Sequence, residues 1–244
     1  MNSRNICARW RRNKEGKNVN IIARIQNDFA TKFGIPRQSG LAPSVLSRIV
    51  FEPDYRNADA LRGLEDFSHL WLIWEFSEAK RDSWSPTVRP PRLGGNTRMG
   101  VFATRSPFRP NPIGLSCVEL KEIIWQSEKG PILIVSGADL MNGTPIYDIK
   151  PYLPYADSHP DARGGFATDV WEKQLRVECG GELMAQIPEN HRQAVLDLLA
   201  QDPRPSYQHD PDRVYGMEYG GMDIRFSVDG NVLTVREVAK KEEK

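Results

Sequence analysis

A run of cationic side chains over residues 80–110 is the first feature that could do chemistry. It holds seven Lys and Arg residues against one acid, Asp82, while the whole chain balances 33 Lys and Arg against 32 Asp and Glu. The seven are Lys80, Arg81, Arg89, Arg92, Arg98, Arg105 and Arg109. The Arg guanidinium binds phosphate or carboxylate at two points. Because the chain as a whole is close to neutral, this segregation favours a nucleotide or nucleic-acid surface over a solvated basic face.

Residues 104–114 form the most distinctive part of this run. They contain Arg105, Arg109, two hydroxyl side chains and three prolines, and they lie between two apolar segments. A tight loop of this composition could capture a carboxylate or a phosphate. It could equally be a stiff connection between two strands.

A second group of titratable residues is Asp148, Lys150 and Tyr152, which alternate along one apolar segment. In a strand, alternate side chains point to the same face, so the three would share one side of a sheet. A carboxylate, an amine and a phenol on one face could handle a proton. The simpler interpretation is a salt bridge with a neighbouring tyrosine.

Several common site types have no counterpart in the sequence. The four histidines lack metal-binding spacing, and Cys7, Cys117 and Cys179 are too dispersed for a thiolate zinc site or a disulfide framework. There is no Gly-x-Gly-x-x-Gly loop, no P-loop and no Gly-x-Ser-x-Gly or His-Glu-x-x-His motif. No apolar run approaches the about 18 residues of a membrane span. We therefore expect a soluble cytoplasmic protein with no metal, no membrane segment and no Rossmann cofactor domain.

Strand patterns dominate the first part of the chain. Short apolar or alternating runs, separated by Gly, Pro and Asn, predict strands at residues 45–51, 70–76, 99–104, 115–125, 132–136 and 146–152. One short helix is expected at residues 59–67. Because no long helix separates the strands, an antiparallel barrel or sandwich is favoured over parallel β-α-β units. The aromatic residues Trp71, Trp74 and Phe76 fit the core of such a sheet better than a stacking surface for bases.

The composition changes after a Pro- and Asp-rich stretch at residues 154–165, which we interpret as a linker. Beyond it the patterns predict a strand near residues 173–178, a helix over residues 189–201 and a hairpin with strands at residues 223–228 and 232–238. The expected fold class is mainly β, with a small α+β C-terminal domain.

The expected organisation has four parts: a basic arm at 1–19, an N-terminal β domain at 20–165, the C-terminal domain at 166–239 and a solvated tail at 240–244. The arm carries Arg4, Arg9, Arg11, Arg12, Lys14 and Lys17 against Glu15. It is either a disordered segment or a wrongly assigned start, or else an RNA-contacting arm or an organelle address.

Five motifs then occur in order over residues 21–208. They are Pro-Arg-Gln-Ser-Gly-Leu from 36, Phe-Ser-His-Leu-Trp from 67, Arg-Pro-Pro-Arg-Leu-Gly-Gly from 89, Met-Gly-Val-Phe-Ala-Thr-Arg-Ser from 99 and Asp-Ile-Lys-Pro-Tyr-Leu-Pro from 148. Together they resemble the TrmO family, also called TsaA or YaeB, of bacterial tRNA N6-adenine methyltransferases. The resemblance implies an antiparallel β-barrel that binds S-adenosylmethionine, a small C-terminal domain and a homodimer. It also implies methylation of t6A, the threonylcarbamoyladenosine beside the anticodon of threonine tRNA, to m6t6A.

The resemblance further implies which residues bind S-adenosylmethionine. They are Pro36, Arg37, Gln38, Phe76, Ser77, Arg105, Leu115, Asp139, Leu140, Met141 and Asn142. Arginine suits the carboxylate of the methyl donor, Asp139 its ammonium or ribose, and the apolar side chains its adenine. Ser77 and Asn142 depart from the His and Asp that relatives can carry at these positions.

The reaction requires the adenine N6 to lose a proton as it attacks the methyl carbon. We expect Asp148 to take that proton, with Lys150 and Tyr152 holding the substrate. Arg89, Arg92, Arg98 and Arg109 are expected to bind the anticodon loop of tRNA. Two alternatives are a tRNA-binding β-barrel without methylation activity and a small-molecule methyltransferase.

Overall fold

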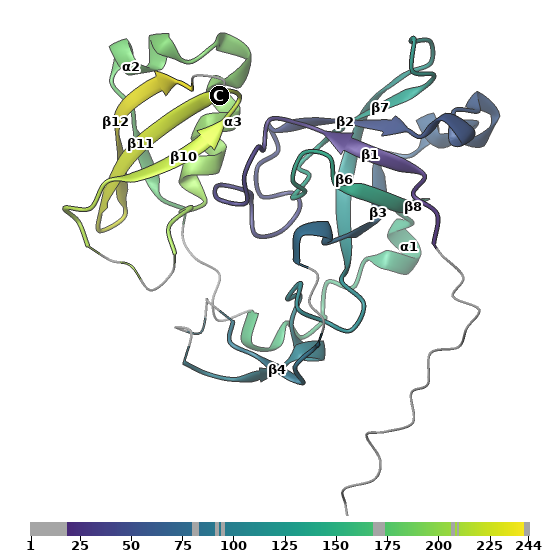
Figure 1. The fold of residues 1–244 in the computed structure, drawn as a ribbon, viewed down its shortest axis with the longest axis horizontal. Coiled ribbons are helices and arrows are strands. Elements are labelled where there is room, and N and C mark those ends of the chain that lie inside the picture. The colour runs from purple at the N-terminus through teal and green to yellow at the C-terminus, as the bar shows by residue number, and fades with distance from the viewer. Residues whose placement is uncertain are drawn as a thin grey trace, which may run out of the picture.

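The chain folds into a closed antiparallel β-barrel followed by a four-stranded sheet (Figure 1). The computed structural model describes residues 19–79, 83–90, 93, 96–167, 174–205, 208 and 210–241. The barrel strands are β1 (Ala23–Gln26), β2 (Leu46–Phe51), β3 (His69–Glu75), β6 (Ile113–Ile124), β7 (Ile132–Ser136) and β8 (Pro145–Pro151). They pair in the order β1-β2-β7-β6-β3-β8, and β8 closes the barrel against β1. The predicted mainly β fold with an antiparallel barrel is confirmed.

Strand β3 illustrates how the sequence builds this barrel. Its alternating pattern buries Leu70, Leu72 and Trp74 in the interior, because successive side chains of a strand point to opposite faces. The intervening Trp71 and Ile73 therefore lie on the outer face. The β6 and β8 residues that pair with this strand continue the same inner and outer surfaces.

Two predictions in this region are wrong in detail. The segment predicted as a helix at 59–67 forms two short 3₁₀ helices, Ala58–Leu61 and Leu64–Asp66, because Gly63 between them has a left-handed φ of 83°. Of the strand predicted at 99–104, only Met99–Gly100 is extended, as β5, which pairs with β4 (Thr87–Val88). Residues Val101–Ala103 turn into a 3₁₀ helix. Further 3₁₀ helices are Pro53–Tyr55, Ser77–Ala79 and Gly165–Ala167.

The predicted linker at 154–165 begins with a short helix, α1 (Pro154–Asp157). After it come β9 (Arg176–Glu178), α2 (Gly181–Gln186), α3 (Glu189–Ala200), β10 (Tyr215–Tyr219), β11 (Met222–Asp229) and β12 (Val232–Lys240). The sheet order is β10-β11-β12-β9, and only the β12–β9 pair is parallel. Helix α3 places Val195, Leu198 and Leu199 in the core beside this sheet. The predicted helix and hairpin are confirmed, whereas β1, β10 and α2 were not predicted.

The barrel interior and the C-terminal part have separate hydrophobic cores, and the β1–β2 loop packs into the second one. The loop between β1 and β2 contributes Phe29, Ala42 and Val45 to the same buried cluster as α3 and β10–β12. The rings of Phe29 and Tyr219 lie 5.4 Å apart. In the same loop the backbone N–H of Ser44 donates to the carboxylate of Asp197 on α3, at 3.1 Å. The β1–β2 loop therefore connects the two parts of the protein.

Some predicted segments fall outside the described residues. These are residues 1–18 of the N-terminal arm, residues 242–244 of the tail and Lys173 of the predicted 173–178 strand. Within the part of the chain that is described, no helix is long and apolar enough to cross a membrane. In the same described part, no group of three His, Cys, Asp or Glu side chains could hold a metal ion.

Candidate functional site

The β1–β2 loop reaches the barrel wall where β6 and the chain leaving β7 separate. Ser39 inserts there, and its hydroxyl accepts a hydrogen bond of 3.2 Å from the backbone N–H of Cys117. The N–H of Gly40 donates to the carbonyl of Gly137 at 2.8 Å. Gly137 has a φ of 74°, and a side chain on it would lie only 3.1 Å from the Gly40 backbone. The two glycines therefore permit the loop to approach the barrel closely.

Asp139 lies beside this loop at the end of a buried hydrogen-bond chain. The indole N–H of Trp74 donates to the hydroxyl of Ser116 at 2.9 Å, and that hydroxyl donates to the Asp139 carboxylate. Burial raises the pKa of the Asp139 carboxyl, while the Ser116 hydroxyl, backbone N–H groups and Arg105 act in the opposite direction. A partly desolvated carboxylate in this position could bind an ammonium or a hydroxyl group.

Arg105 supplies the complementary charge on the other side of the loop. Its guanidinium donates to the side-chain oxygen of Gln38 at 2.5 Å, and the Gln38 amide donates to the carbonyl of Arg37. The Arg105 side chain is exposed, so it remains accessible to a ligand carboxylate. The structure therefore brings together Gln38, Arg105 and Asp139 around one loop.

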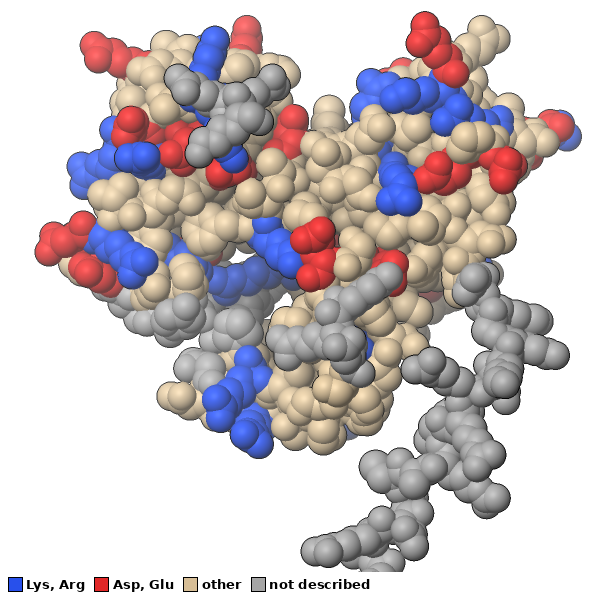
Figure 2. Space-filling view, in the orientation of Figure 1, with Lys and Arg blue, Asp and Glu red and all other residues tan. Residues whose placement is uncertain are grey.

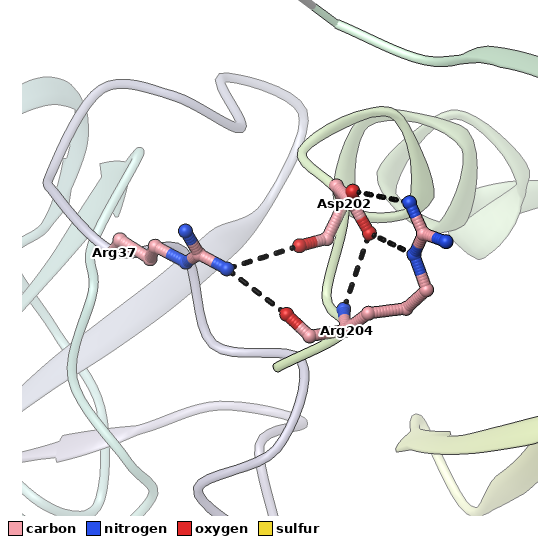
Figure 3. A network of polar contacts seen from close by, with 3 residues as sticks. All are labelled: Arg37, Asp202 and Arg204. Carbon is pink, nitrogen blue, oxygen red and sulfur yellow. Dashed lines mark hydrogen bonds and ion pairs between the residues drawn. The ribbon is translucent and has the colours of Figure 1, made fainter. Parts of the chain in front are cut away.

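Arg37 contacts the C-terminal part of the chain (Figure 3). Its guanidinium points to the C-terminal part of the chain and donates to the carbonyl of Arg204 at 3.0 Å and to that of Asp202 at 3.5 Å. Arg204 is 7% exposed and forms two hydrogen bonds of 2.8 Å with the Asp202 carboxylate. The described contacts of Arg37 thus hold the segment that leads to Gln38.

The other predicted cofactor residues fall into two groups. Pro36 and Leu140 are buried, and the carbonyl of Leu140 accepts a hydrogen bond from the Asn27 side chain. The Asn142 side chain accepts from the backbone N–H of Asn27 at 3.1 Å. Phe76 packs against Trp74, with 4.2 Å between ring centroids.

The remaining three members are at least partly exposed. Leu115 is 52% exposed on the outer face of β6, Ser77 is exposed and Met141 is half-buried. These three side chains leave room for direct contact with a ligand, whereas Pro36 and Leu140 shape the wall behind it.

The predicted catalytic residues lie on the outer face of the barrel. Asp148 and Lys150 form an ion pair of 2.8 Å on β8. Strand β3 separates β8 from Leu115 on β6, with Ile73 directly between Asp148 and Leu115. Two strand spacings put these residues about 10 Å apart. Tyr152 lies beyond the end of β8, where its ring packs 5.8 Å from that of Trp71. It is not part of the Arg105 cluster.

A neighbouring phenol is excluded as the proton acceptor. Burial and a hydrogen bond with Glu75 raise the pKa of Tyr147 to about 12. At neutral pH this side chain therefore stays protonated. Asp148 is the one acidic side chain of β8.

The predicted tRNA-binding arginines have distinct settings. Arg89 and Arg98 are exposed in the lobe that carries β4 and β5. This lobe lies at the bottom of Figure 1, and Lys and Arg side chains show on it in Figure 2. Arg109 braces the 104–112 loop by donating to the carbonyl of Thr104 at 2.8 Å. Arg92 lies outside the described residues.

Sequence reasoning missed Ser116 and the pair Asp202–Arg204. Ser116 occupies an inward position of β6, between Gly114 and Val118. A hydroxyl on the buried face of a strand needs a partner, and this was the available signal. Asp202 and Arg204 contact Arg37 across 165 and 167 residues of sequence, so no local pattern could indicate them.

Residues 24–158 match the tRNA-methyltransferase O N-terminal domain, and residues 170–241 match the TrmO C-terminal domain. The chain belongs to the TrmO family. The first match includes Gln38, Arg105 and Asp139, and the second includes Asp202 and Arg204, which contact Arg37.

Individual relatives cover nearly the whole chain. A tRNA (adenine(37)-N6)-methyltransferase of Escherichia coli (strain K12) is 44% identical over 215 residues, which is 85% of this chain and 91% of the relative. A putative S-adenosylmethionine-dependent methyltransferase, RcsF, of Pseudomonas aeruginosa PAO1 is 44% identical over 216 residues, again 85% of this chain and 91% of the relative. A crystal structure of TrmO from P. aeruginosa matches with a TM-score of 0.73 and 36% identity, covering 91% of this chain and 96% of that one.

Proposed function

We propose that this protein transfers a methyl group from S-adenosylmethionine to N6 of adenosine 37 in tRNA. The observation that carries the proposal is the similarity over both TrmO domains to proteins named for this activity. The cluster of Gln38, Arg105, Ser116 and Asp139 supports it, because it offers charged and polar groups in the barrel wall.

The residues present fit the expected methyl donor. The exposed guanidinium of Arg105 would bind its carboxylate, and the partly buried Asp139 carboxylate would bind its ammonium or ribose hydroxyls. The exposed Leu115, together with Met141 and Phe76, offers an apolar surface for its adenine. When bound, S-adenosylmethionine supplies an electrophilic methyl group on a sulfonium.

The chain's own contribution to the chemistry is positioning and proton removal. The adenosine N6 must be held about 3–3.5 Å from the methyl carbon and in line with the bond that breaks. Ser39 holds the loop to the barrel and Arg37 holds it to the C-terminal segment through hydrogen bonds, while Gln38 accepts one from Arg105. As N6 bonds to carbon it loses a proton, for which we assign Asp148 as acceptor, worth about 10²–10⁴ in rate.

Lys150 and Tyr152 would then hold the substrate beside Asp148. The Lys150 ammonium ion-pairs with Asp148 and keeps that carboxylate oriented along β8. Tyr152 and Trp71 form an aromatic contact farther along the same face. Because Asp148 lies about two strand spacings from Leu115, the substrate base would have to lie across the outer face of β3.

We further infer that the protein acts as a homodimer. Ile113 is 46% exposed at the start of β6, two residues before Leu115 and at the border of the proposed donor site. A large apolar side chain exposed at such a border suits a contact with a second copy that adjoins the donor site without covering it. Ile113→Lys would then shift the molecular mass measured by light scattering from dimer to monomer, whereas an unchanged mass would reject this face as the dimer contact.

The specific substrate we propose is t6A at position 37 of threonine tRNA, converted to m6t6A in the cytoplasm, where tRNA is used. The test is to incubate purified protein with methyl-labelled S-adenosylmethionine and threonine tRNA, with or without the threonylcarbamoyl group. We expect label in the N6-methylated nucleoside only when that group is present. Label in unmodified adenosine 37 would reject the t6A requirement, and no label in tRNA would reject the function.

Two other outcomes identify the alternatives. Binding of tRNA without transfer of label, and without binding of S-adenosylmethionine, indicates a tRNA-binding module. Turnover on small molecules in the absence of tRNA, with little response to salt, indicates a small-molecule methyltransferase.

A further inference from the structure

Two aromatic side chains lie exposed and adjacent in the β4–β5 lobe. Trp84 is 50% exposed and Phe102 is 72% exposed. Their ring centroids are 6.1 Å apart, and the ring planes are tilted by 34°. Single exposed apolar residues are common on proteins, but a pair of large rings at this distance forms a surface that a planar ligand can cover.

Hydrogen bonds fix the backbone on both sides of this pair. Trp84 precedes β4 and Phe102 follows β5, and the two strands pair through Thr87 with Gly100. The backbone N–H of Val101 donates to the carbonyl of Pro86 at 2.9 Å. The pairing of β4 with β5 therefore brings the two rings together.

The charge around the pair is positive. The guanidinium carbon of Arg109 lies 6.0 Å from the centre of the Phe102 ring, and the same guanidinium is held by the carbonyl of Thr104. No Asp or Glu occurs in the sequence from Ser83 to Val118. The exposed Arg89 and Arg98 belong to this acid-free segment. A ligand that covers the rings would therefore meet cations and no carboxylate of this segment, which suits a polyanion.

The pair also lies near Arg105 of the proposed donor site. Phe102 precedes Arg105 by three residues, a length of chain that spans at most about 11 Å. A group stacked on the rings would consequently lie close to the donor site.

We propose that Trp84 and Phe102 form a stacking surface for an unpaired nucleobase of the RNA substrate, with Arg109 closing the Phe102 side. This rests on the proposed tRNA function and adds a base-binding subsite to it. Proteins recognise single-stranded RNA loops by stacking unpaired bases on aromatic rings and Arg planes, with basic groups around them for phosphate. An apolar partner protein could pack against the rings, but it would offer no anionic group to the surrounding Arg side chains.

The test compares alanine and aromatic replacements at the two positions. Phe102→Ala and Trp84→Ala should each weaken binding of an anticodon stem-loop RNA by about 5- to 150-fold, whereas Phe102→Tyr and Trp84→Phe should retain most of the affinity. The dissociation constant for S-adenosylmethionine should stay within twofold. Trp125→Ala is the matched control, because Trp125 is also exposed, by 41%, but lies beyond the end of β6 outside this lobe.

A second measurement separates stacking from a change in the fold. A series of loop RNAs is made in which each RNA has one abasic nucleotide, at a different position. One RNA of this series should bind the natural protein as weakly as the intact RNA binds the Phe102→Ala variant. Removal of that base should then cost the Phe102→Ala protein little further affinity, as expected for two partners in one contact.

Three outcomes would overturn the stacking proposal. The first is unchanged RNA affinity in both alanine variants, and the second is parallel loss of S-adenosylmethionine binding, which would assign Phe102 to the donor site. The third is a change in oligomeric mass that accounts for the whole effect, which would assign the rings to a contact between copies.

If the natural protein methylates tRNA and the alanine variants do so with unchanged KM, only the stacking surface is rejected. If the natural protein does not methylate tRNA, the proposed function is rejected. The RNA affinities of the alanine variants then still test whether the two rings bind RNA.

Discussion

The guanidinium of Arg37 donates a 3.0 Å hydrogen bond to the backbone carbonyl of Arg204, although the two residues are separated by most of the chain. Arg204 is itself held by Asp202 through two side-chain hydrogen bonds. Arg37 is followed by Gln38, which contacts Arg105. A continuous series of contacts therefore connects the C-terminal segment with the proposed donor site.

We expect Arg204→Ala to impair donor binding without removing a donor contact. The Asp202 carboxylate would lose its partner, costing about 1.5–3 kcal/mol of unfolding free energy. The loop with Gln38 would be held less firmly, and KM for S-adenosylmethionine should rise about tenfold, equivalent to about 1.4 kcal/mol, with kcat little changed. Steady-state kinetics and thermal melting measure both effects.

The control for that variant is Arg225→Ala. Arg225 also pairs with an aspartate two residues earlier, but at 53% side-chain exposure and away from Arg37. Exposed ion pairs contribute about 0–1 kcal/mol, so stability and KM should both stay near the natural values. A kcat loss in Arg204→Ala with unchanged KM would contradict the positioning role.

Arg105→Ala should abolish most donor binding while the fold persists. The exposed guanidinium is the group placed to meet the donor carboxylate, and a charged hydrogen bond is worth about 1.5–3 kcal/mol. Titration calorimetry should show S-adenosylmethionine affinity reduced by at least about tenfold. Arg62→Ala, which removes an exposed ion pair with Asp59, is the control. Normal heat with Arg105→Ala would remove this residue from the donor site.

The barrel was predictable because its main strands carry a strong local signal. The run from Leu70 to Trp74 is apolar at every position, and β7 was predicted with the bounds that the structure shows, Ile132–Ser136. Strand β1 has only four residues, and Gly216 interrupts β10, so neither shows enough periodicity. Strand β5 was overestimated because the apolar Val101 and Phe102 continue its pattern into a 3₁₀ helix.

The site was predictable where motifs carried it. Gln38 and Arg105 come from two of the five motifs and Asp139 from the separate segment 139–142, and the fold places the three around one loop. The contacts of Arg37 were not predictable, because they depend on how the C-terminal sheet packs against the β1–β2 loop. Equally, no sequence pattern reveals that β3 lies between Asp148 and Leu115, since that depends on strand order in the closed barrel.

Asp139→Asn should separate stability from binding. Burial raises the pKa of Asp139 in the fold, so the stability it contributes is present below the unfolded pKa and is lost as pH rises through the folded pKa. Because asparagine does not ionise, the variant does not lose this stability as the pH rises. At pH 7 its unfolding free energy should equal or exceed that of the natural protein, and the difference should shrink below about pH 4. Urea unfolding at both pH values measures this, and donor affinity should fall.

Asp157→Asn provides the opposite control. Hydrogen bonds from the backbone N–H of Leu153 and from the Trp71 indole lower the pKa of Asp157. The stability it contributes is therefore present above the unfolded pKa and is lost as pH falls through the folded pKa. Its variant should lose stability at pH 7. If Asp139→Asn also lost stability at pH 7, the hydrogen bond from Ser116 would outweigh burial.

Asp148→Asn should lower kcat with little effect on KM for either substrate. Loss of a proton acceptor reduces the rate by about 10²–10⁴, while the amide keeps the shape of the side chain on β8. Single-turnover transfer of labelled methyl groups isolates this step. Lys150→Met, which removes only the ion-pair partner, should reduce the rate less. A rate within twofold of the natural protein in Asp148→Asn would exclude it as the acceptor.

The joint replacement of Arg89 and Arg98 by alanine should weaken tRNA binding through phosphate contacts alone. Both side chains are exposed in the acid-free segment. Neither takes part in the hydrogen bonds that join Arg105 to Gln38 and Ser116 to Asp139. Each neutralised phosphate contributes about 0.7–0.9 to the slope of log affinity against log salt. The double variant should therefore show a slope smaller by about 1.4–1.8, with unchanged affinity for S-adenosylmethionine. Replacement of Arg24 and Arg62, also exposed but each ion-paired to a carboxylate, should leave the slope unchanged. Equal slopes for all the proteins would place the tRNA backbone on another face.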